Sequence, residues 1–319
     1  MCLTPLVLGL STLDTPCASA SLELAGRYAM VVQDAGSDPI FSLHRARVEA
    51  SLGRDGAWTR VALMPARSGD GSGDYGVAGE SLVYSLQIAE VGYTRGPLGL
   101  TAGLVDDPWG LTGNVAWGHI SWSGIMSSRN GWTHRSDLGV VGAFETGPVT
   151  ASVTVSNGEG AKRPEQNDAK NVAGLVTVAV MDLPLSVTLY GSQGSLGADN
   201  AGNHRVGVRV HGQAPRLGYG VEGLAAWGVG GDESATPRGV SGWVSAGRDL
   251  PVTAVVRADA WQDLPGDADT NGLRAIAWAG PELGPATVAL GVEHTRTGGG
   301  STDSTMFGVQ LSSRLATVR

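Results

Sequence analysis

Apolar and polar residues alternate strictly in sixteen short stretches of this chain. The clearest stretch runs from Pro148 to Ser156, with valine or alanine at odd positions from 149 and threonine or serine at even ones. Because successive side chains of a β-strand point to opposite faces, this pattern predicts strands with one apolar and one polar face. We therefore expect an all-β fold.

The connectors between these stretches alternate between short and long. The short ones are built from turn formers, as in Gly53–Gly56 and Arg95–Pro97, and the long ones are rich in Gly, Ser and Asp, as in Ser68–Glu80. Every second connector then lies at the same end of the structure. The pattern predicts a transmembrane antiparallel β-barrel of about 16 strands, with long outer loops, short periplasmic turns and both termini at the periplasmic end.

We place the strands at residues 21–32, 40–52, 57–67, 82–94, 98–105, 137–146, 148–157, 171–181, 184–194, 203–213, 217–228, 238–249, 251–263, 271–281, 285–296 and 304–316. These lengths suit the roughly 9–11 tilted residues that cross a bilayer. The connector at 106–136 is exceptionally long and contains a strand-like piece at 115–122. Counting that piece as a strand would break the alternation of connectors, so we predict an extended third outer loop.

Residues 1–20 have the features of a secretory signal, and residues 21–319 are expected to form the barrel. Leu3–Leu10 supply an apolar core, and Ala18-Ser19-Ala20 is a small-residue cleavage site. The segment lacks the usual Lys or Arg near its start, which a start codon placed too far downstream would explain. Both cysteines, Cys2 and Cys17, lie in this segment, so cleavage would leave a chain without cysteine, as suits an oxidising periplasm.

Composition excludes several classes of protein. The net charge of −8 with no basic cluster argues against a nucleic-acid partner. The 49 glycines and 16% charged residues do not suit a helical soluble enzyme. The six histidines have no metal-ligand spacing. We expect neither a metal nor a cofactor.

The cost of placing charge in lipid assigns the two faces of the wall. An Arg or Lys facing lipid near the bilayer midplane costs about 2–4 kcal/mol, so charged residues must face the lumen. In the stretch 251–263, Arg257 and Asp259 share the polar phase, whereas Val256 lies on the apolar one. The residues that this test predicts to line a pore and to set its selectivity are Arg27, Arg45, Arg47, Glu49, Arg60, Arg205, Arg209, Arg257 and Arg274.

The aromatic residues divide between the two faces. Tyr93, Phe144, Tyr219 and Trp227 lie on the outward phase near strand ends, where they predict part of an aromatic girdle at the membrane interface. The tryptophans at 243, 261 and 278 lie on the lumen phase of adjacent strands. They form either a slide for sugar rings or a surface that packs the long loop, and we favour the packing role.

Two hairpins carry a resemblance to a known family. The runs from Ser42 to Leu63 and from Ser85 to Trp109 are similar to hairpins of bacterial outer-membrane porins, and most similar to those of phosphate-selective and general-diffusion porins. The resemblance implies a 16-stranded barrel, usually a trimer in the outer membrane, whose third outer loop folds inward as a constriction. The chain departs from the family in ending at Arg319 rather than an aromatic residue, and in lacking the acidic-aromatic-glycine motif of general porins.

Four arginines of the first three strands, at positions 27, 45, 47 and 60, predict a basic stripe on the lumen wall. Mirroring the first two strands about their loop places Arg27 roughly opposite Arg45. Like charges that lie directly opposite one another destabilise a sheet, so the presence of this pair suggests a functional role. The same counting places Glu49 near Arg60. The alternative is that lumen charges only solvate the wall and pair with one another, as Asp259 and Arg274 would.

The third loop supplies the residues expected opposite the basic stripe. They are Asp106 and Asp107 at the root of the loop, together with Trp109 and Trp117 further along. If the two carboxylates face the stripe, the passage between them carries a transverse electric field. We therefore predict that this loop constricts the pore.

These features favour a passive diffusion porin for small hydrophilic solutes or ions, with a leaning toward anions and no enzymatic activity. Two alternatives remain open. One is an outer-membrane lipase or protease, for which His294 and Ser301 are the nearest candidates. The other is a structural or adhesive barrel with a plugged lumen.

Overall fold

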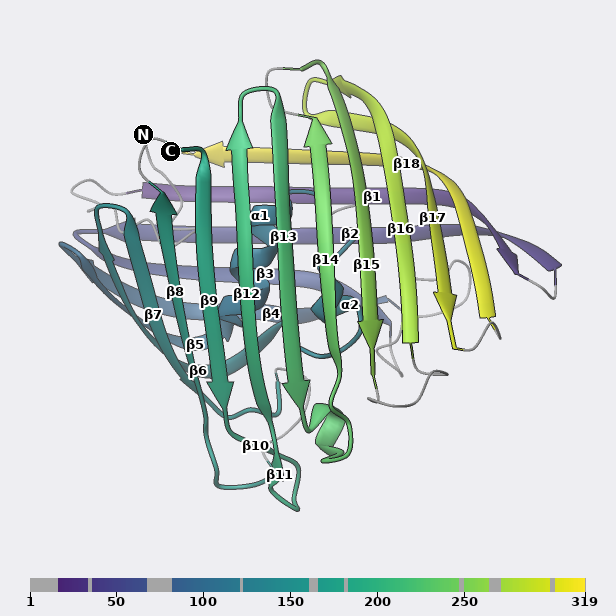
Figure 1. The fold of residues 1–319 in the computed structure, drawn as a ribbon. Helices are drawn as coiled ribbons and strands as arrows, with labels where there is room; N and C mark the ends of the chain where they lie inside the picture. The colour runs from purple at the N-terminus through teal and green to yellow at the C-terminus, as the bar shows by residue number, and fades with distance from the viewer. Residues whose placement is uncertain are drawn as a thin grey trace.

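The computed structural model describes residues 17–33, 36–67, 82–120, 123–160, 166–180, 183–246, 250–263, 271–298 and 302–318. Sixteen strands form one closed antiparallel barrel, in which β1 pairs with β18 to complete the ring (Figure 1). The strands of the wall are β1 (Cys17–Gln33), β2 (Gly36–Arg54), β3 (Ala57–Arg67), β4 (Leu82–Arg95), β5 (Leu98–Asp106), β6 (Ser136–Thr146), β7 (Val149–Ser156), β8 (Asn171–Val180), β9 (Leu185–Gln193), β12 (His204–Ala214), β13 (Leu217–Trp227), β14 (Arg238–Ala246), β15 (Val252–Gln262), β16 (Asn271–Leu283), β17 (Ala286–Thr297) and β18 (Thr302–Val318). The predicted fold class and strand number are confirmed.

The first hairpin differs from the prediction because both of its strands are longer. β1 starts within the predicted signal segment, with Ser19 opposite Val318 on one side and Ser51 on the other. β2 starts at Gly36, so backbone pairing continues through a segment that the alternation rule assigned to a loop. Cleavage after Ala20 stays a prediction, and most of the predicted signal, residues 1–16, lies outside the described residues.

The wall has an apolar exterior and a charged interior, as the phase of each strand predicts. In β12, Val208 is 45% exposed on the outside, whereas its neighbour Arg209 is 0% exposed inside the barrel. Tyr93, Phe144 and Trp227 are also exposed on the outward phase near strand ends. A barrel with this exterior is suited to insertion in a lipid bilayer.

The two ends of the barrel differ in their connectors. The short turns, the start of β1 and the end of β18 lie at one end, and the strand ends that the longer connectors join lie at the other (Figure 1). The first short turn holds Asp55 and Gly56 at φ values of 51° and 82°, the left-handed pair that a type I′ hairpin turn requires. At the other end, two loops carry small elements, β10 (Ser195–Leu196), β11 (Ala201–Gly202) and the 3-10 turn η1 (Val229–Gly231).

Four tryptophans of the lumen face lie directly opposite glycines on the neighbouring strand. The pairs are Trp58 with Gly92, Trp243 with Gly220, Trp261 with Gly272, and Trp278 with Gly291. A Cβ added at any of these glycines would lie 2.0–2.3 Å from an indole carbon. The absence of a side chain therefore lets each indole lie flat against the wall, which keeps large rings inside the barrel without filling its centre.

The connector between β5 and β6 contains two helices, α1 (Pro108–Trp117) and α2 (Met126–Arg129). The strand-like piece at 115–122 thus begins as the end of a helix, and its described residues form no strand of the barrel. Among the described residues, no helix is long and apolar enough to cross a membrane.

Candidate functional site

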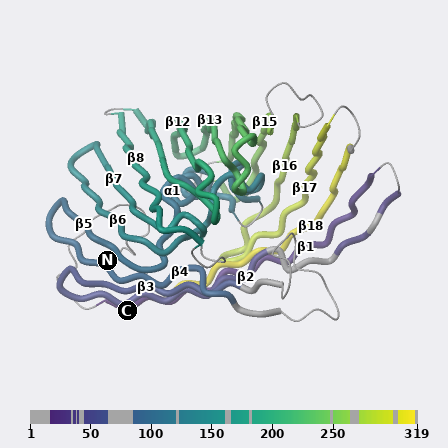
Figure 2. Tube along the Cα trace, turned by 90° about the horizontal axis from the view of Figure 1, so that it is seen from below, coloured from purple at the N-terminus to yellow at the C-terminus, as the bar shows by residue number. Residues whose placement is uncertain are grey.

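The long connector between β5 and β6 folds into the barrel. Figure 2 shows α1 inside the ring of strands. Asp107 begins α1 by accepting a hydrogen bond from the Gly110 backbone N–H at 2.8 Å, and Gly118 ends it at a φ of 72°. The backbone N–H of Asp107 also donates to the Arg135 carbonyl at 3.0 Å. This bond ties the two ends of the loop together at its root.

The loop packs against one side of the lumen through apolar side chains. Trp109, Trp117 and Trp132 are fully buried in a cluster with wall residues of β8, β9 and β13–β17. The ring of Trp117 meets Trp243 edge-on at 5.9 Å, and Trp109 lies 5.4 Å from Tyr190. The lumen-facing tryptophans of β14–β16 therefore form a packing surface for the loop. This is the role that the sequence favoured over a slide for sugar rings.

Four arginines on the same side of the lumen bind the loop. Arg205 donates to the Trp132 carbonyl at 2.6 Å, and Arg257 donates to the Gly124 carbonyl at 2.7 Å. Arg209 reaches Thr112 Oγ1 at 3.1 Å, and Arg274 reaches Asn130 Oδ1 at 3.4 Å. We call Arg205, Arg209, Arg257 and Arg274 the anchor arginines.

Nearby carboxylates and indole rings hold three of the anchor arginines in place. Arg209 forms an ion pair with Glu222 at 2.8 Å and lies 3.9 Å above the Trp109 ring. Arg257 binds Asp259 at 2.7 Å, and Arg274 binds the same carboxylate at 3.4 Å. A guanidinium that is paired with a carboxylate contributes little to the electric field in the open part of the lumen. These side chains therefore hold the loop in place and do not present an unpaired charge to a solute.

A fifth arginine, Arg129, belongs to the loop itself and binds the barrel wall from α2. Arg129 binds both carboxylate oxygens of Glu293 on β17, at 2.8 and 2.6 Å. A two-point contact of this kind fixes the orientation of the guanidinium as well as its position. The loop is thus held by polar contacts from several strands and by a continuous apolar core.

The basic stripe lies on the other side of the lumen, on β2 and β3. Arg45 pairs with Glu23 at 2.6 Å, and Arg47 pairs with Glu49 at 2.6 Å. Arg60 binds Glu90 at 2.7 Å and reaches across to Asp106, at the root of the loop, at 2.9 Å. The sequence-based expectation that Asp106 faces this stripe agrees with this contact.

One detail of the predicted stripe was wrong. Arg27 lies opposite Ser42 and not Arg45. Its guanidinium instead binds Gln310 on β18 and lies 4.9 Å from the Trp278 ring. The error arises because the two strands pair as far as Gln33 and Gly36, whereas the predicted loop spanned residues 33–39. The centre of the hairpin therefore lies earlier in the chain, and the partner of Arg27 moves by three places. Glu49 lies opposite Ala62 and Arg60 lies opposite Ser51, so the two are diagonal neighbours on adjacent strands and Glu49 is near Arg60, as predicted.

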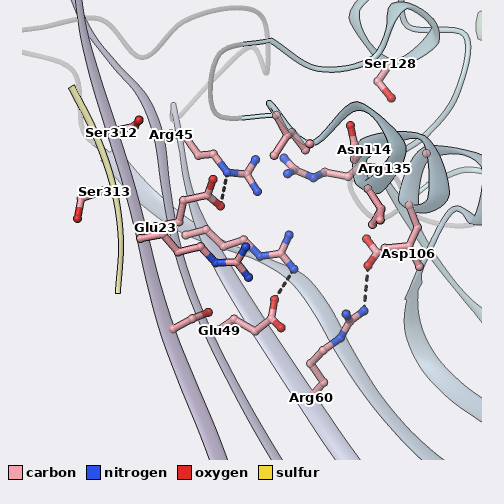
Figure 3. A pocket seen from close by; sticks show the side chains of 18 of the residues that line it. Glu23, Arg45, Glu49, Arg60, Asp106, Asn114, Ser128, Arg135, Ser312 and Ser313 are labelled. Atoms are coloured by element: carbon pink, nitrogen blue, oxygen red, sulfur yellow. Dashed lines mark hydrogen bonds and ion pairs between the residues drawn. The ribbon is translucent and has the colours of Figure 1, made fainter. Parts of the chain in front are cut away.

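A cavity of about 510 Å³ separates the stripe from the loop (Figure 3). Its lining includes Arg45, Arg47, Arg60, Arg135 and Arg314, and the carboxylates of Glu23, Glu49 and Asp106. Five guanidinium groups against three carboxylates leave an excess of two positive charges along the described lining. Residues of α1, such as Leu111 and Asn114, complete the opposite side. We call this cavity the passage.

The structure distributes the predicted site residues between two places. Arg45, Arg47, Glu49, Arg60 and Asp106 line the passage, whereas the remaining ones do not. Asp107 points away from the passage, toward the Tyr190 hydroxyl at 3.4 Å. Trp109 and Trp117 of α1 are buried between the loop and the barrel wall.

Two arginines of the passage were not among the predicted residues. Arg135 lies at the end of the loop, and Arg314 lies on β18. Arg314 shares the phase of Gln310, which contacts Arg27 in the lumen, so the alternation of the last strand contained a usable signal. No pattern in the sequence indicated Arg135, because its place depends on how the loop folds back.

The ionisable groups of the loop are perturbed by burial. Burial raises the pKa of Asp107 to about 6, and burial lowers the pKa of His119 to about 4. Among the described residues, no group of three or more His, Cys, Asp or Glu side chains is arranged to hold a metal ion. Of the candidate pair for an enzyme, His294 contacts Thr305 Oγ1 at 2.9 Å. Ser301 lies outside the described residues.

No family model matches the chain, and no curated protein matches it in sequence. Its fold is nevertheless similar to solved outer-membrane proteins over nearly their whole length. An anion-selective porin from Comamonas acidovorans superposes with a TM-score of 0.67 at 12% identity, covering 95% of this chain and 100% of that one. OmpF of Salmonella typhi, in complex with daunomycin, gives 0.66 at 9% identity, covering 92% and 97%.

A third similar structure is OmpT, an outer-membrane protein of Vibrio cholerae, with a TM-score of 0.64 at 12% identity, covering 96% of this chain and 100% of that one. Identities this low show a shared fold and nothing finer. The wall with its apolar exterior, the closed ring of sixteen strands and these similarities agree with one another. The chain is an outer-membrane β-barrel with the porin fold.

Proposed function

We propose that the protein is a passive diffusion porin for small hydrophilic solutes and ions, with a leaning toward anions. The observation that carries this proposal is the passage between the basic stripe and the loop. Transport through a fixed pore needs only a hole of suitable width and an electric field inside it. Both are supplied by residues that face one another across a water-accessible gap.

The charge of the passage supports the leaning toward anions. Arg45 and Arg47 each have a single carboxylate partner, while Arg314 is exposed on β18. An excess of positive charge in a narrow channel between low-dielectric walls raises the local concentration of anions. The shared fold with an anion-selective porin is consistent with this proposal. Phosphate belongs among the anions to be tested, because the first hairpins resemble those of phosphate-selective porins.

The direct test is the conductance of the purified protein in a planar lipid bilayer. We expect large, ohmic current steps in KCl. A membrane that stays silent, although circular dichroism shows folded barrel in the same preparation, would refute the porin and favour a plugged structural or adhesive barrel.

The charge leaning is tested by the reversal potential in a salt gradient. Neutralising the stripe with Arg45→Ala and Arg47→Ala together should lower the anion-to-cation permeability ratio by about threefold or more, because two positive charges leave the passage. An unchanged ratio in a variant of normal conductance would show that these arginines only pair with their carboxylates.

We further propose that the protein forms a homotrimer and has no enzymatic activity. A solved structure of similar fold, OmpT of Vibrio cholerae, is described in a trimer form. Analytical ultracentrifugation in detergent tests the trimer. Incubation with lipid and peptide substrates tests catalysis, and turnover that is abolished by His294→Ala would establish the enzyme alternative.

A further inference from the structure

A second, smaller cavity of about 100 Å³ adjoins the passage. Strands β3–β7 form its wall, and α1 covers it through Pro108 and Leu111. It shares Arg60, Asp106 and Leu111 with the lining of the passage. The ion pair of Arg60 with Asp106 thus stands between the two spaces. We call the smaller one the side chamber.

The side chamber exists because small side chains face the lumen in neighbouring strands. Gly99 lies opposite Ala143, and Ala143 lies opposite Ser152. The side chains in this row across β5–β7 are therefore all small. Next to this row, Trp58 lies flat over Gly92 and supplies an aromatic side to the chamber. The hollow is therefore set by the composition of the wall and does not depend on the position of a mobile side chain.

Three polar groups that line the side chamber have no hydrogen-bond partner among the described residues. They are the indole Nε1–H of Trp58 and the hydroxyls of Ser152 and Thr154. Ser152 and Thr154 are each only 5% exposed. Because buried polar groups are nearly always satisfied, an exception beside a cavity indicates groups that a bound molecule can satisfy.

The charges around the side chamber differ from those of the passage. Among the described lining residues the one guanidinium, that of Arg60, is already bound to Glu90 and Asp106, so two carboxylates face one positive charge. An anion therefore finds no unpaired positive charge there. A bare cation is also poorly matched, because the unpartnered indole N–H can only donate. A neutral molecule with several hydroxyls can both donate and accept, and can lay its C–H groups against the Trp58 ring.

We propose that the side chamber is a binding site for a small neutral polyol, between glycerol and a pentose in size. This inference builds on the proposed function, since the bound polyol would be a solute on its way through the passage. The hydroxyls of the solute pair with Trp58, Ser152 and Thr154, and its carbon skeleton contacts Leu111. The site then gives the protein affinity for neutral solutes independently of Arg45 and Arg47, which line only the passage.

Binding of glycerol and of arabinose to the detergent-solubilised protein, measured by saturation-transfer NMR, tests the site without requiring transport. Thr154→Val removes a hydroxyl at nearly constant shape, and Ser152→Leu fills the chamber. Each should weaken polyol binding about tenfold, the effect of losing one well-formed contact. Thr150→Val, on the same face of β7 but outside the chamber, should bind as the wild type does.

The outcomes separate this inference from the proposed function. Normal KCl conductance without polyol binding, or binding that Ser152→Leu leaves unchanged, overturns the site and leaves the porin intact. Binding that is lost in Ser152→Leu, in a protein without conductance, supports the site and refutes the porin. Equal loss in the Thr150→Val control would also count against the site, because the effect would then not be local.

Discussion

The lumen contains two sets of arginines. Both occupy lumen-facing positions of their strands, but one set contacts the loop and the other lines an open cavity. Those on β12, β15 and β16 lie beneath the loop, bound to its carbonyls and in most cases to carboxylates. Those on β2 and β3 have carboxylate partners too, but they line an open space of about 510 Å³. An arginine whose side chain faces the lumen is therefore not necessarily part of a pore. What lies opposite the side chain decides whether it holds the structure or meets a solute.

The largest effect is expected from breaking an anchor. Arg209→Met would leave the Glu222 carboxylate buried without its partner, and such losses cost about 3–5 kcal/mol. We expect a clearly lower midpoint of unfolding, followed by circular dichroism in detergent. Replacing both partners, with Arg209→Met and Glu222→Leu, should recover much of the loss, because no charge then remains buried. A single variant as stable as the wild type would show that water reaches this pair.

A smaller effect should distinguish the two sets by ion selectivity. Arg47→Gln removes a charge from the lining of the passage, whereas Arg274→Gln removes one from beneath the loop. We expect Arg47→Gln to lower the anion-to-cation permeability ratio by about twofold, an energy well below 1 kcal/mol. Arg274→Gln should leave the ratio unchanged. A larger shift in Arg274→Gln than in Arg47→Gln would reverse the assignment of roles.

The smallest expected effect is a pH dependence of stability that arises from Asp107, the N-cap residue of α1. Burial raises the pKa of Asp107 to about 6 from an ordinary value of 3.8, so the folded protein holds this proton more tightly than the unfolded chain does. Stability should therefore fall as the pH rises from about 4 to about 6, and change no further from this source above that range. The midpoint of thermal unfolding at several pH values measures the step.

Asp107→Asn is the matched variant for this step, because asparagine is an equally good helix cap and does not titrate. Its pH profile should be flatter than that of the wild type between pH 4 and 6. The same slope in both proteins would assign the dependence to other groups, among which His119 has the opposite sign. Burial lowers the pKa of His119 to about 4, so its contribution to stability grows as the pH rises from about 4 to 6.5.

The structure of the barrel wall could be predicted from local sequence patterns. Alternation specifies which side chain faces lipid, and the cost of charge in a bilayer makes that assignment robust. Residues such as Val208 and Arg209 could therefore be placed without a structure. The sixteen strands and the inward direction of the charges followed from these local rules, because the period of a strand depends only on its own residues.

The division of the charged residues between the open passage and the buried anchors depends on contacts between distant parts of the chain. The loop between β5 and β6 folds onto one side of the lumen because Trp109, Trp117 and Trp132 find an apolar surface there, built from strands far apart in sequence. Arg27 lies away from Arg45 because β1 and β2 pair as far as Gln33 and Gly36, through residues that the alternation of the sequence assigned to a loop. The passage and the buried anchors follow from this packing of the loop, which long-range contacts determine and local sequence patterns do not encode.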